Sequence, residues 1–250
     1  MAEKKNVVVR IKRQQNPQEP ARWEEFELPW RPAMNVIICL RDIAERAVTR
    51  DGRPTTPVSY DANCLEEVCG ACAMVVNGKP RQACSALIDQ MTQPIRLEPL
   101  TKFPLVRDLV VDRSSMFANL KRMKAWVPID GTYDLGEGPR LSPDVQSKAY
   151  PLSRCITCGN CLEVCQQVNA NSDFVGAAII SQVRLFNLHP TGAMHKRERL
   201  EAVMGAGGVQ DCANAQNCIK VCPKDIPLTE SIAEVNRQAI RQAVVGWLLG

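Results

Sequence analysis

The sequence lacks three features that would place it in common functional classes. Its 250 residues carry a formal net charge of only +4, too small a basic excess for a protein that binds nucleic acid through its phosphates. It contains only two histidines, His189 and His195, and we expect both to be surface or packing residues rather than catalysts. Its apolar run near the C-terminus, AVVGWLL at residues 243–249, is too short to cross a bilayer.

The N-terminus also lacks the features of a secretory signal. The opening MAEKKNVVVRIKRQQ has neither an apolar segment followed by a cleavage site nor a twin-arginine motif. We therefore expect the chain to stay in a reducing cytoplasm, where clustered thiols are more often metal ligands than disulfides. Twelve cysteines are many for a chain of this length, and they predict a metal protein.

The apolar pattern changes near residue 104 and predicts two domains, 1–104 and 105–250. In the first domain we expect a helix that Asn35 caps and that stops at Gly52, and a hairpin turn at Asn77-Gly78. Alternating apolar residues predict strands at 6–13, 23–28 and 95–99. Strands and one helix in about 100 residues indicate a small α+β sheet domain.

The second domain has mainly helical periodicity. We expect helices within the segments 108–126, 173–188, 195–206 and 229–245. Residues 128–152 are rich in Gly and Pro and have no clear period. A stretch of this length is usually functional or a linker, and we interpret it as an ordered wrap against a partner or against the sheet domain.

The cysteines of the first domain follow the spacing of a plant-type [2Fe–2S] site. Cys64, Cys69 and Cys72 form C-x4-C-x2-C, and Cys84 supplies a distal fourth thiolate. Gly70 keeps a side chain out of the loop, so that backbone N–H groups can point at the cluster. Zinc is the alternative, but zinc sites usually present two separated C-x2-C pairs, and no histidine lies nearby for a Rieske centre. The remaining cysteine, Cys39, is expected to be an ordinary buried thiol.

The second domain contains two ferredoxin-like cysteine runs. They are CITCGNCLEVC at 155–165 and DCANAQNCIKVCPKD at 211–225. In two-cluster ferredoxins the fourth cysteine of a run binds the other cluster. This rule predicts that one [4Fe–4S] cluster is held by Cys155, Cys158, Cys161 and Cys222.

The neighbouring site has one ligand too few. The crossover rule assigns it Cys165, Cys212 and Cys218, while Ala215 occupies the position of the fourth thiolate. An iron without a protein ligand is easily lost, so we expect a [3Fe–4S] cluster here. The alternative is a [4Fe–4S] cluster with water or an outside side chain on its fourth iron.

This order of motifs resembles the iron–sulfur subunits of succinate dehydrogenase and fumarate reductase. The resemblance spans the chain and includes LVVDRS at 109–114 and NCIKVCPKDIPLTE at 217–230. It implies an α+β fold, in which a plant-type ferredoxin (β-grasp-like) domain is followed by an α-helical bacterial-ferredoxin-like domain.

The resemblance also implies a function and partners. The chain would be the electron-transfer subunit of a succinate:quinone oxidoreductase of the tricarboxylic acid cycle and respiratory chain. It would pass electrons from FAD on a flavoprotein subunit through its three clusters to quinone at a membrane anchor. Because clusters transfer single electrons, this role requires no acid, base or nucleophile from the chain, and we assign no catalytic residue.

The resemblance is closest to the menaquinone-linked branch, whose anchor is a dihaem cytochrome b. Ubiquinone-linked members carry Pro and Trp after the position of Cys165 and His after that of Cys212. Here Gln166, Gln167 and Ala213 occupy this region and are candidates for the quinone side of the site. We expect a peripheral membrane protein on the cytoplasmic face of the inner (plasma) membrane.

Two alternative functions follow from the same residues. A quinol:fumarate reductase would use the same clusters with the opposite electron flow, and the sequence does not distinguish the two directions. A zinc-stabilised scaffold without a redox role is the second alternative, which the cysteine spacing disfavours.

Overall fold

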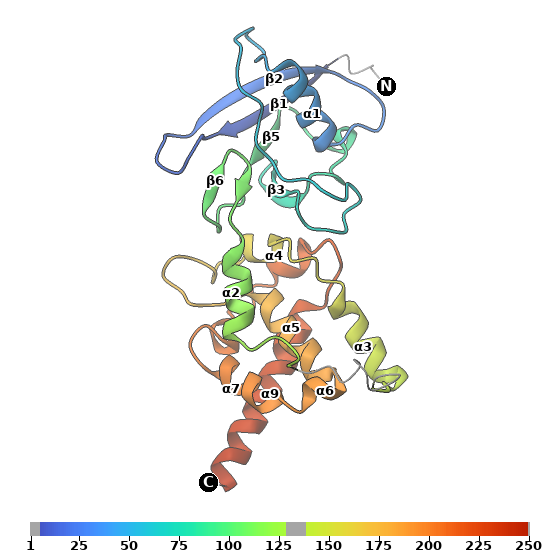
Figure 1. Cartoon of the computed structure of the whole chain (residues 1–250), viewed down its shortest axis with the longest axis vertical. Helices are drawn as coiled ribbons and strands as arrows, with labels where there is room; N and C mark the ends of the chain where they lie inside the picture. Colours follow the sequence, from blue (N-terminus) through green and yellow to red (C-terminus); the bar gives the residue numbers. More distant parts are fainter. Residues whose placement is uncertain (1–5, 129–138, 250) are drawn as a thin grey trace. The chain divides into compact units, whose positions relative to one another are not determined.

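The computed structural model describes residues 6–128 and 139–249 (Figure 1). The chain divides into two compact units. The sheet unit comprises the residues up to Arg113 together with Cys158–Glu163, and the helical unit comprises Ser114–Thr157 and the residues from Val164 onward.

The sheet unit is built on a five-stranded mixed sheet with the order β2-β1-β5-β3-β4. β1 pairs antiparallel with β2 and parallel with β5, as in a β-grasp fold. The elements of this unit are β1 (Asn6–Arg13), β2 (Arg22–Pro29), α1 (Val36–Arg46), β3 (Ala73–Val76), β4 (Lys79–Gln82), the 3₁₀ turn η1 (Ile88–Gln90), β5 (Ile95–Glu98), β6 (Leu105–Arg107), β7 (Val110–Val111) and α4 (Asn160–Glu163).

The core of the sheet unit follows the predicted alternation. Val7, Val9 and Ile11 of β1 are buried in one hydrophobic cluster with Leu40 and Ile43 of α1. These side chains leave water together, which is the main force that holds the helix against the sheet. The hairpin between β3 and β4 turns at Asn77 and Gly78, both with positive φ, as predicted.

The end of α1 differs from the prediction. The helix ends at Arg46, because Ala47 adopts a left-handed conformation and its N–H donates to the Ile43 carbonyl. The expected stop at Gly52 was wrong: Gly52 lies beyond the helix, in a turn where its N–H donates to the Thr49 carbonyl. Alanine carries no local signal for a helix end, whereas glycine does.

The segment around Asp108 is also different from the expected helix at 108–126. Residues 105–111 form the β6–β7 hairpin, and the helix α2 begins only at Ser114. Asp108 is buried and accepts hydrogen bonds from Arg13 Nε at 3.1 Å and from the Ser59 N–H at 3.0 Å. This buried ion pair ties the hairpin to β1, so the sheet unit extends to Arg113, past the boundary expected near residue 104.

The helical unit is centred on α5, which packs against α2, α3 and α9 (Figure 1). Ser181 and Arg184 of α5 are buried, and Arg184 pairs with Glu230 of α9 at 2.7 Å. The elements of this unit are α2 (Ser114–Arg122), α3 (Pro143–Ser153), α5 (Ala177–Leu188), α6 (Pro190–Ala193), α7 (Lys196–Met204), the 3₁₀ turn η2 (Val209–Asp211), α8 (Asn217–Lys220) and α9 (Leu228–Leu249).

The sequence of segment 128–152 has no clear period, but the segment is not irregular throughout. Its second half forms α3, whose first turn is capped by the Ser142 hydroxyl and starts with Pro143. Pro at the first position and a serine cap both favour a helix start. The interpretation as a wrap falls partly on residues 129–138, which lie outside the described part of the chain.

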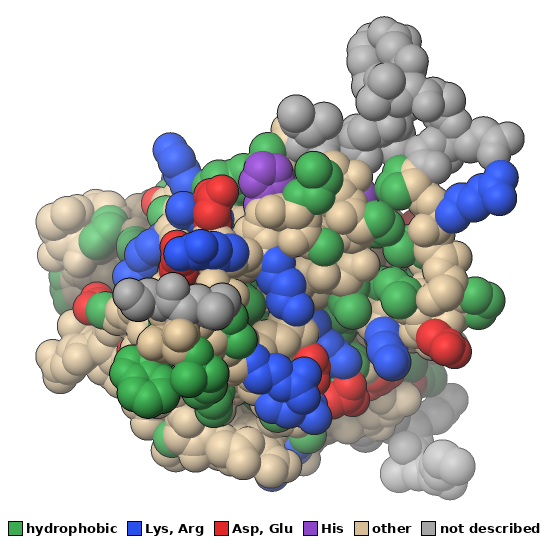
Figure 2. All heavy atoms as spheres, turned by 90° about the horizontal axis from the view of Figure 1, so that it is seen from below, with side chains coloured by type: hydrophobic (Ala, Val, Ile, Leu, Met, Phe, Trp, Pro, Cys, Tyr) green, Lys and Arg blue, Asp and Glu red, His purple; other side chains and the backbone are tan. Residues whose placement is uncertain are grey.

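The end of the helical unit that carries α9 has a mixed surface. Figure 2 shows Lys and Arg side chains among hydrophobic ones on this face. The last turns of α9 expose several apolar side chains, namely Ile240, Val244, Val245, Trp247 and Leu248. None of the helices in the described ranges has the length and apolar character needed to cross a membrane.

Candidate iron–sulfur cluster sites

The first cysteine motif forms an irregular loop between α1 and β3. The backbone N–H groups of Val68 and Cys69 lie 3.2 and 3.3 Å from the Sγ of Cys64, and that of Ala71 lies 3.4 Å from the Sγ of Cys69. Backbone N–H groups, led by that of Glu66, lower the pKa of Cys64 to about 7. The loop therefore favours the thiolate form that binds iron.

The other two thiols of this motif are buried beside the sheet. Cys84 follows β4, and burial together with the neighbouring Cys72 raises the pKa of Cys84 to about 11. Cys64 adds to that shift, so the structure brings the loop and the distal cysteine together. Gln82, fully buried on β4, places its Oε1 3.5 Å from the Sγ of Cys72, a neighbour that the spacing of the cysteines did not reveal.

The segment Cys158–Glu163, which carries two ligands of the predicted [4Fe–4S] site, packs within the sheet unit. Glu163 accepts hydrogen bonds from the N–H groups of Thr101 and Lys102 at 2.8 and 3.0 Å. Gly159 has φ +88° and lies against the Phe103 ring, so that a Cβ there would come within 2.8 Å of it. Cys158 and Cys161 are both buried.

The remaining two ligands predicted for this cluster lie in the helical unit, where they are neighbours. Burial raises the pKa of Cys155, and the charge of Cys222 adds to the increase. Since these residues are far apart in sequence, their proximity is what the crossover rule requires.

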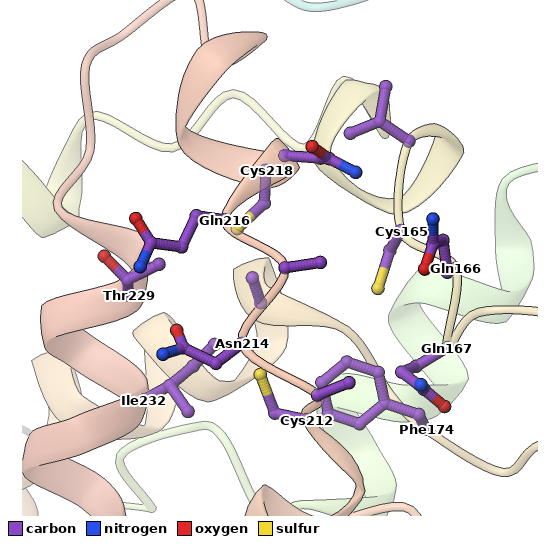
Figure 3. Close-up of a pocket in the computed structure, with 15 residues that line it drawn as sticks. Cys165, Gln166, Gln167, Phe174, Cys212, Asn214, Gln216, Cys218, Thr229 and Ile232 are labelled. Atoms are coloured by element: carbon purple, nitrogen blue, oxygen red, sulfur yellow. The ribbon is translucent and has the colours of Figure 1, made fainter.

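The third set of cysteines lines a single pocket of the helical unit (Figure 3). Cys165 comes from the first cysteine run, and Cys212 and Cys218 come from the second, with Cys218 in α8. Burial raises the pKa of Cys218, and the charges of Cys165 and Cys212 raise it further. Three thiols gathered in this way repel one another as thiolates, and bound iron would remove that repulsion.

The same pocket contains every residue that the sequence singled out at this site. Ala215, Gln166, Gln167 and Ala213 all line it. Sequence reasoning did not find Phe174, Thr229 and Ile232, which complete the wall from α9 and from the segment before α5 (Figure 3). No local motif marks them, because the packing of α9 and of the segment before α5 brings them here.

The backbone of all three loops fits an anionic cluster. Left-handed non-glycine residues occur in each, namely Leu65 and Glu67, Thr157, and Asn214 and Gln216. Alternation of left- and right-handed residues turns successive N–H groups toward the same side, which creates a concave site for an anion. Among the described residues, no three His, Cys, Asp or Glu side chains converge as they would on one metal ion.

The remaining candidate residues have structural contacts. Cys39 is buried in α1, and burial raises its pKa to about 12. The His189 Nδ1 accepts a hydrogen bond from the Gly192 N–H at 3.2 Å and so caps α6. His195 lies 3.5 Å from Glu198.

Two protein-family models match the chain, one in each half. Residues 8–118 match the family model of a 2Fe-2S iron-sulfur cluster binding domain, and residues 151–226 match that of a 4Fe-4S dicluster domain. Neither model describes a zinc site.

Full-length relatives match over nearly the whole chain. The succinate dehydrogenase iron-sulfur subunit of Bacillus subtilis (strain 168) is 59% identical over 97% of this chain and 96% of its own length. The fumarate reductase iron-sulfur subunit of Wolinella succinogenes is 31% identical over 87% of this chain and 90% of its own length.

A solved structure has the same fold. A chain of the Mycobacterium smegmatis Sdh1 complex in the apo form superimposes with a TM-score of 0.79 at 19% identity, covering 95% of this chain and 96% of that one. Together with the cysteine motifs and the mixed sheet followed by helices, these matches lead to one conclusion. The chain belongs to the family of iron–sulfur subunits of succinate dehydrogenases and fumarate reductases.

Proposed function

We propose that the chain carries electrons from the FAD of a flavoprotein subunit to quinone at a membrane anchor, in a succinate dehydrogenase. It does so through [2Fe–2S], [4Fe–4S] and [3Fe–4S] clusters held by eleven of its twelve cysteines. The observation that carries the proposal is the pocket where Cys165, Cys212 and Cys218 meet Ala215. This pocket and the two further cysteine sets provide sites for three clusters of different iron content, which a structural zinc protein does not require.

The residues of the chain do three things for the clusters. When bound, the clusters accept and pass on single electrons, so that two-electron chemistry at a flavin can be coupled to a quinone. The cysteines supply thiolates, and the N–H groups of Val68, Cys69 and Ala71 donate to the sulfurs of the first loop. Such hydrogen bonds and the burial of Cys72 and Cys84 tune the reduction potential.

The third site is our candidate for the quinone end. Gln166, Gln167 and Ala213 line its wall beside the cysteines, and the two glutamine amides would donate to the carbonyl oxygens of a quinone bound next to the cluster. Menaquinone is the proposed acceptor and a dihaem cytochrome b the proposed anchor. The chain would then be a peripheral subunit on the cytoplasmic face of the plasma membrane.

Chemical analysis and spectroscopy test the proposal together. Summing the three cluster types gives about nine non-haem iron and ten acid-labile sulfide per chain in the anaerobically purified complex. Redox-titrated EPR should show one cluster that is paramagnetic when oxidised, as expected for [3Fe–4S], and two that are paramagnetic when reduced. An iron content near that of one cluster, or a colourless protein loaded with zinc, would contradict the proposal.

A quinol:fumarate reductase is the second candidate, and the match to the Wolinella succinogenes subunit favours keeping it. The same clusters would serve, with electrons running from quinol to fumarate. Rates of succinate oxidation and of fumarate reduction, measured on the assembled complex with the same menaquinone analogue, distinguish the two. Faster succinate oxidation supports the dehydrogenase, and the opposite ratio supports the reductase.

A further inference from the structure

Arg113 contacts two cysteine loops of the sheet unit at once. Its Nη1 donates to the carbonyl oxygen of Gly70 at 2.7 Å, and its Nη2 donates to that of Ala71 at 3.2 Å. Both carbonyls lie between Cys69 and Cys72 in the first loop. The same Nη1 also donates to the carbonyl of Cys158 at 3.3 Å. One guanidinium therefore joins the first loop to Cys158, whose thiol is a proposed ligand of the second cluster.

The chemistry of arginine suits this position. The guanidinium is planar and keeps its charge at any physiological pH, and its fixed donors can serve several carbonyls in one geometry. Arg113 is half-buried, so its charge is screened less than that of a surface side chain. Lysine would retain the charge, but its single ammonium cannot reproduce the fork.

The surroundings make Arg113 part of a rigid support. The segment that carries Cys158 is fixed further along by Glu163, which bonds Thr101 and Lys102. It is also held by the packing of Gly159 on Phe103. The contacts of Glu163 and Gly159 join this segment to residues 101–103. Arg113 instead joins it to the first cysteine loop.

We propose that Arg113 is a positioning residue for electron transfer between the first and second clusters. Its hydrogen bonds hold the Gly70–Ala71 backbone and the Cys158 backbone at a constant separation, and its charge stabilises the reduced form of each cluster. The step it serves moves one electron from the reduced two-iron site to the oxidised four-iron site, with no bond or proton transferred. The inference rests on the ligand assignment of the proposed function.

The experiment compares Arg113→Met and Arg113→Lys in the assembled complex with the unaltered complex. Redox-titrated EPR gives the reduction potentials of both clusters. The spin relaxation of the reduced [2Fe–2S] signal, measured with the [4Fe–4S] cluster oxidised and then reduced, reports the separation of the clusters, because dipolar coupling falls steeply with distance. Arg53→Met is the control, since the Arg53 side chain is 78% exposed and its ion pair is with nearby Asp51.

We expect Arg113→Met to shift both potentials to lower values and to weaken the relaxation enhancement. Arg113→Lys should keep the potentials near those of the unaltered complex but also weaken the enhancement, and Arg53→Met should change neither. If Arg113→Met does not retain its clusters, the inference is tested by the spin relaxation of the reduced [2Fe–2S] signal in Arg113→Lys. Unchanged potentials and relaxation in a cluster-loaded variant overturn the inference, whereas absence of either signal from the unaltered complex overturns the proposed function as well.

Discussion

Ala215 presents a methyl group where the spacing of the second cysteine run places a thiolate in a complete ferredoxin. It lines the pocket that Cys165, Cys212 and Cys218 also line. The side chain at this one position therefore bears directly on how many irons the third site retains.

We predict that Ala215→Cys converts the third cluster to [4Fe–4S]. Non-haem iron should rise from about nine to about ten per chain, and the EPR signal of the oxidised state should disappear. Ala213→Cys is the matched control, since Ala213 lines the same pocket but lies outside the ligand frame. An unchanged oxidised-state signal in Ala215→Cys, with full cluster content, would contradict the assignment of the third site.

A second prediction concerns Gln82, whose side chain lies against Cys72, a proposed ligand of the first cluster. A bound Cys72 is a thiolate, which accepts hydrogen bonds but cannot donate to the Gln82 carbonyl. Among the described residues the Gln82 Nε2 has no hydrogen-bond partner, so a half-turn of the amide gives it the Cys72 sulfur as acceptor. Donation to a cluster sulfur stabilises the reduced form.

Gln82→Leu should therefore lower the reduction potential of the [2Fe–2S] cluster. Redox-titrated EPR measures this, with Gln90→Leu as an exposed control on η1. Equal potentials for Gln82→Leu and the unaltered complex would show that the amide does not bond the ligand.

Among the elements, the short loop at Gly159 leaves little space for a side chain. Gly159 and Gly52 have nearly the same backbone conformation, with φ +88° and +82°. They differ in their surroundings: a Cβ at Gly159 would meet the Phe103 ring, whereas at Gly52 it would have nothing within 4 Å among the described residues. The pair separates the effect of backbone strain from that of crowding.

We predict that Gly52→Ala lowers the free energy of unfolding by about 1–2 kcal/mol, the cost of a left-handed alanine. Gly159→Ala should lose about 1–3 kcal/mol more through overpacking and should release iron from the second site. Thermal unfolding and iron analysis of the two variants check this. Equal losses would show that the Phe103 ring moves aside freely.

Elements set by neighbouring residues could be predicted from the sequence. The turn at Asn77-Gly78 and the cap at Asn35 depend on side chains within a few positions, and both are present. The end of α1 at Ala47 and the helix α3 could not be predicted. The Ala47 carbonyl accepts a hydrogen bond from the Thr55 N–H at 2.8 Å, a contact that no local motif marks. The helix α3 contains Pro151 and follows a stretch rich in Gly and Pro.

Contacts between distant residues limited the prediction further. The domain boundary depends on Arg13 and Asp108, which are 95 positions apart and pair inside the sheet unit. The roles proposed for Arg113 and Gln82 likewise depend on packing, because neither belongs to a spacing motif. The ligand sets stay a prediction from spacing, because cluster chemistry imposes short, regular intervals on the cysteines of a motif.

At the scale of the whole molecule, the side chains of β1 and β5 that lie in the hydrophobic cluster come from outside the three cysteine loops. We predict that removing the clusters speeds amide hydrogen exchange in segments 61–72, 155–165 and 212–222. The buried strands β1 and β5 should exchange as slowly as before, because their core is made of Val, Ile and Leu side chains. Mass spectrometry of loaded and iron-depleted chains measures both. If the loops exchange at the same rate in the loaded and the iron-depleted chain, the prediction is contradicted.

The left-handed residues in these loops have a consequence for the living cell. Leu65, Glu67 and Thr157 hold conformations that each cost about 1–3 kcal/mol and persist only when something compensates. A chain made during iron starvation lacks that compensation and opens more often, and opened chains are substrates for proteases. We expect the abundance of this subunit to follow the iron supply through its turnover, even when its synthesis is constant.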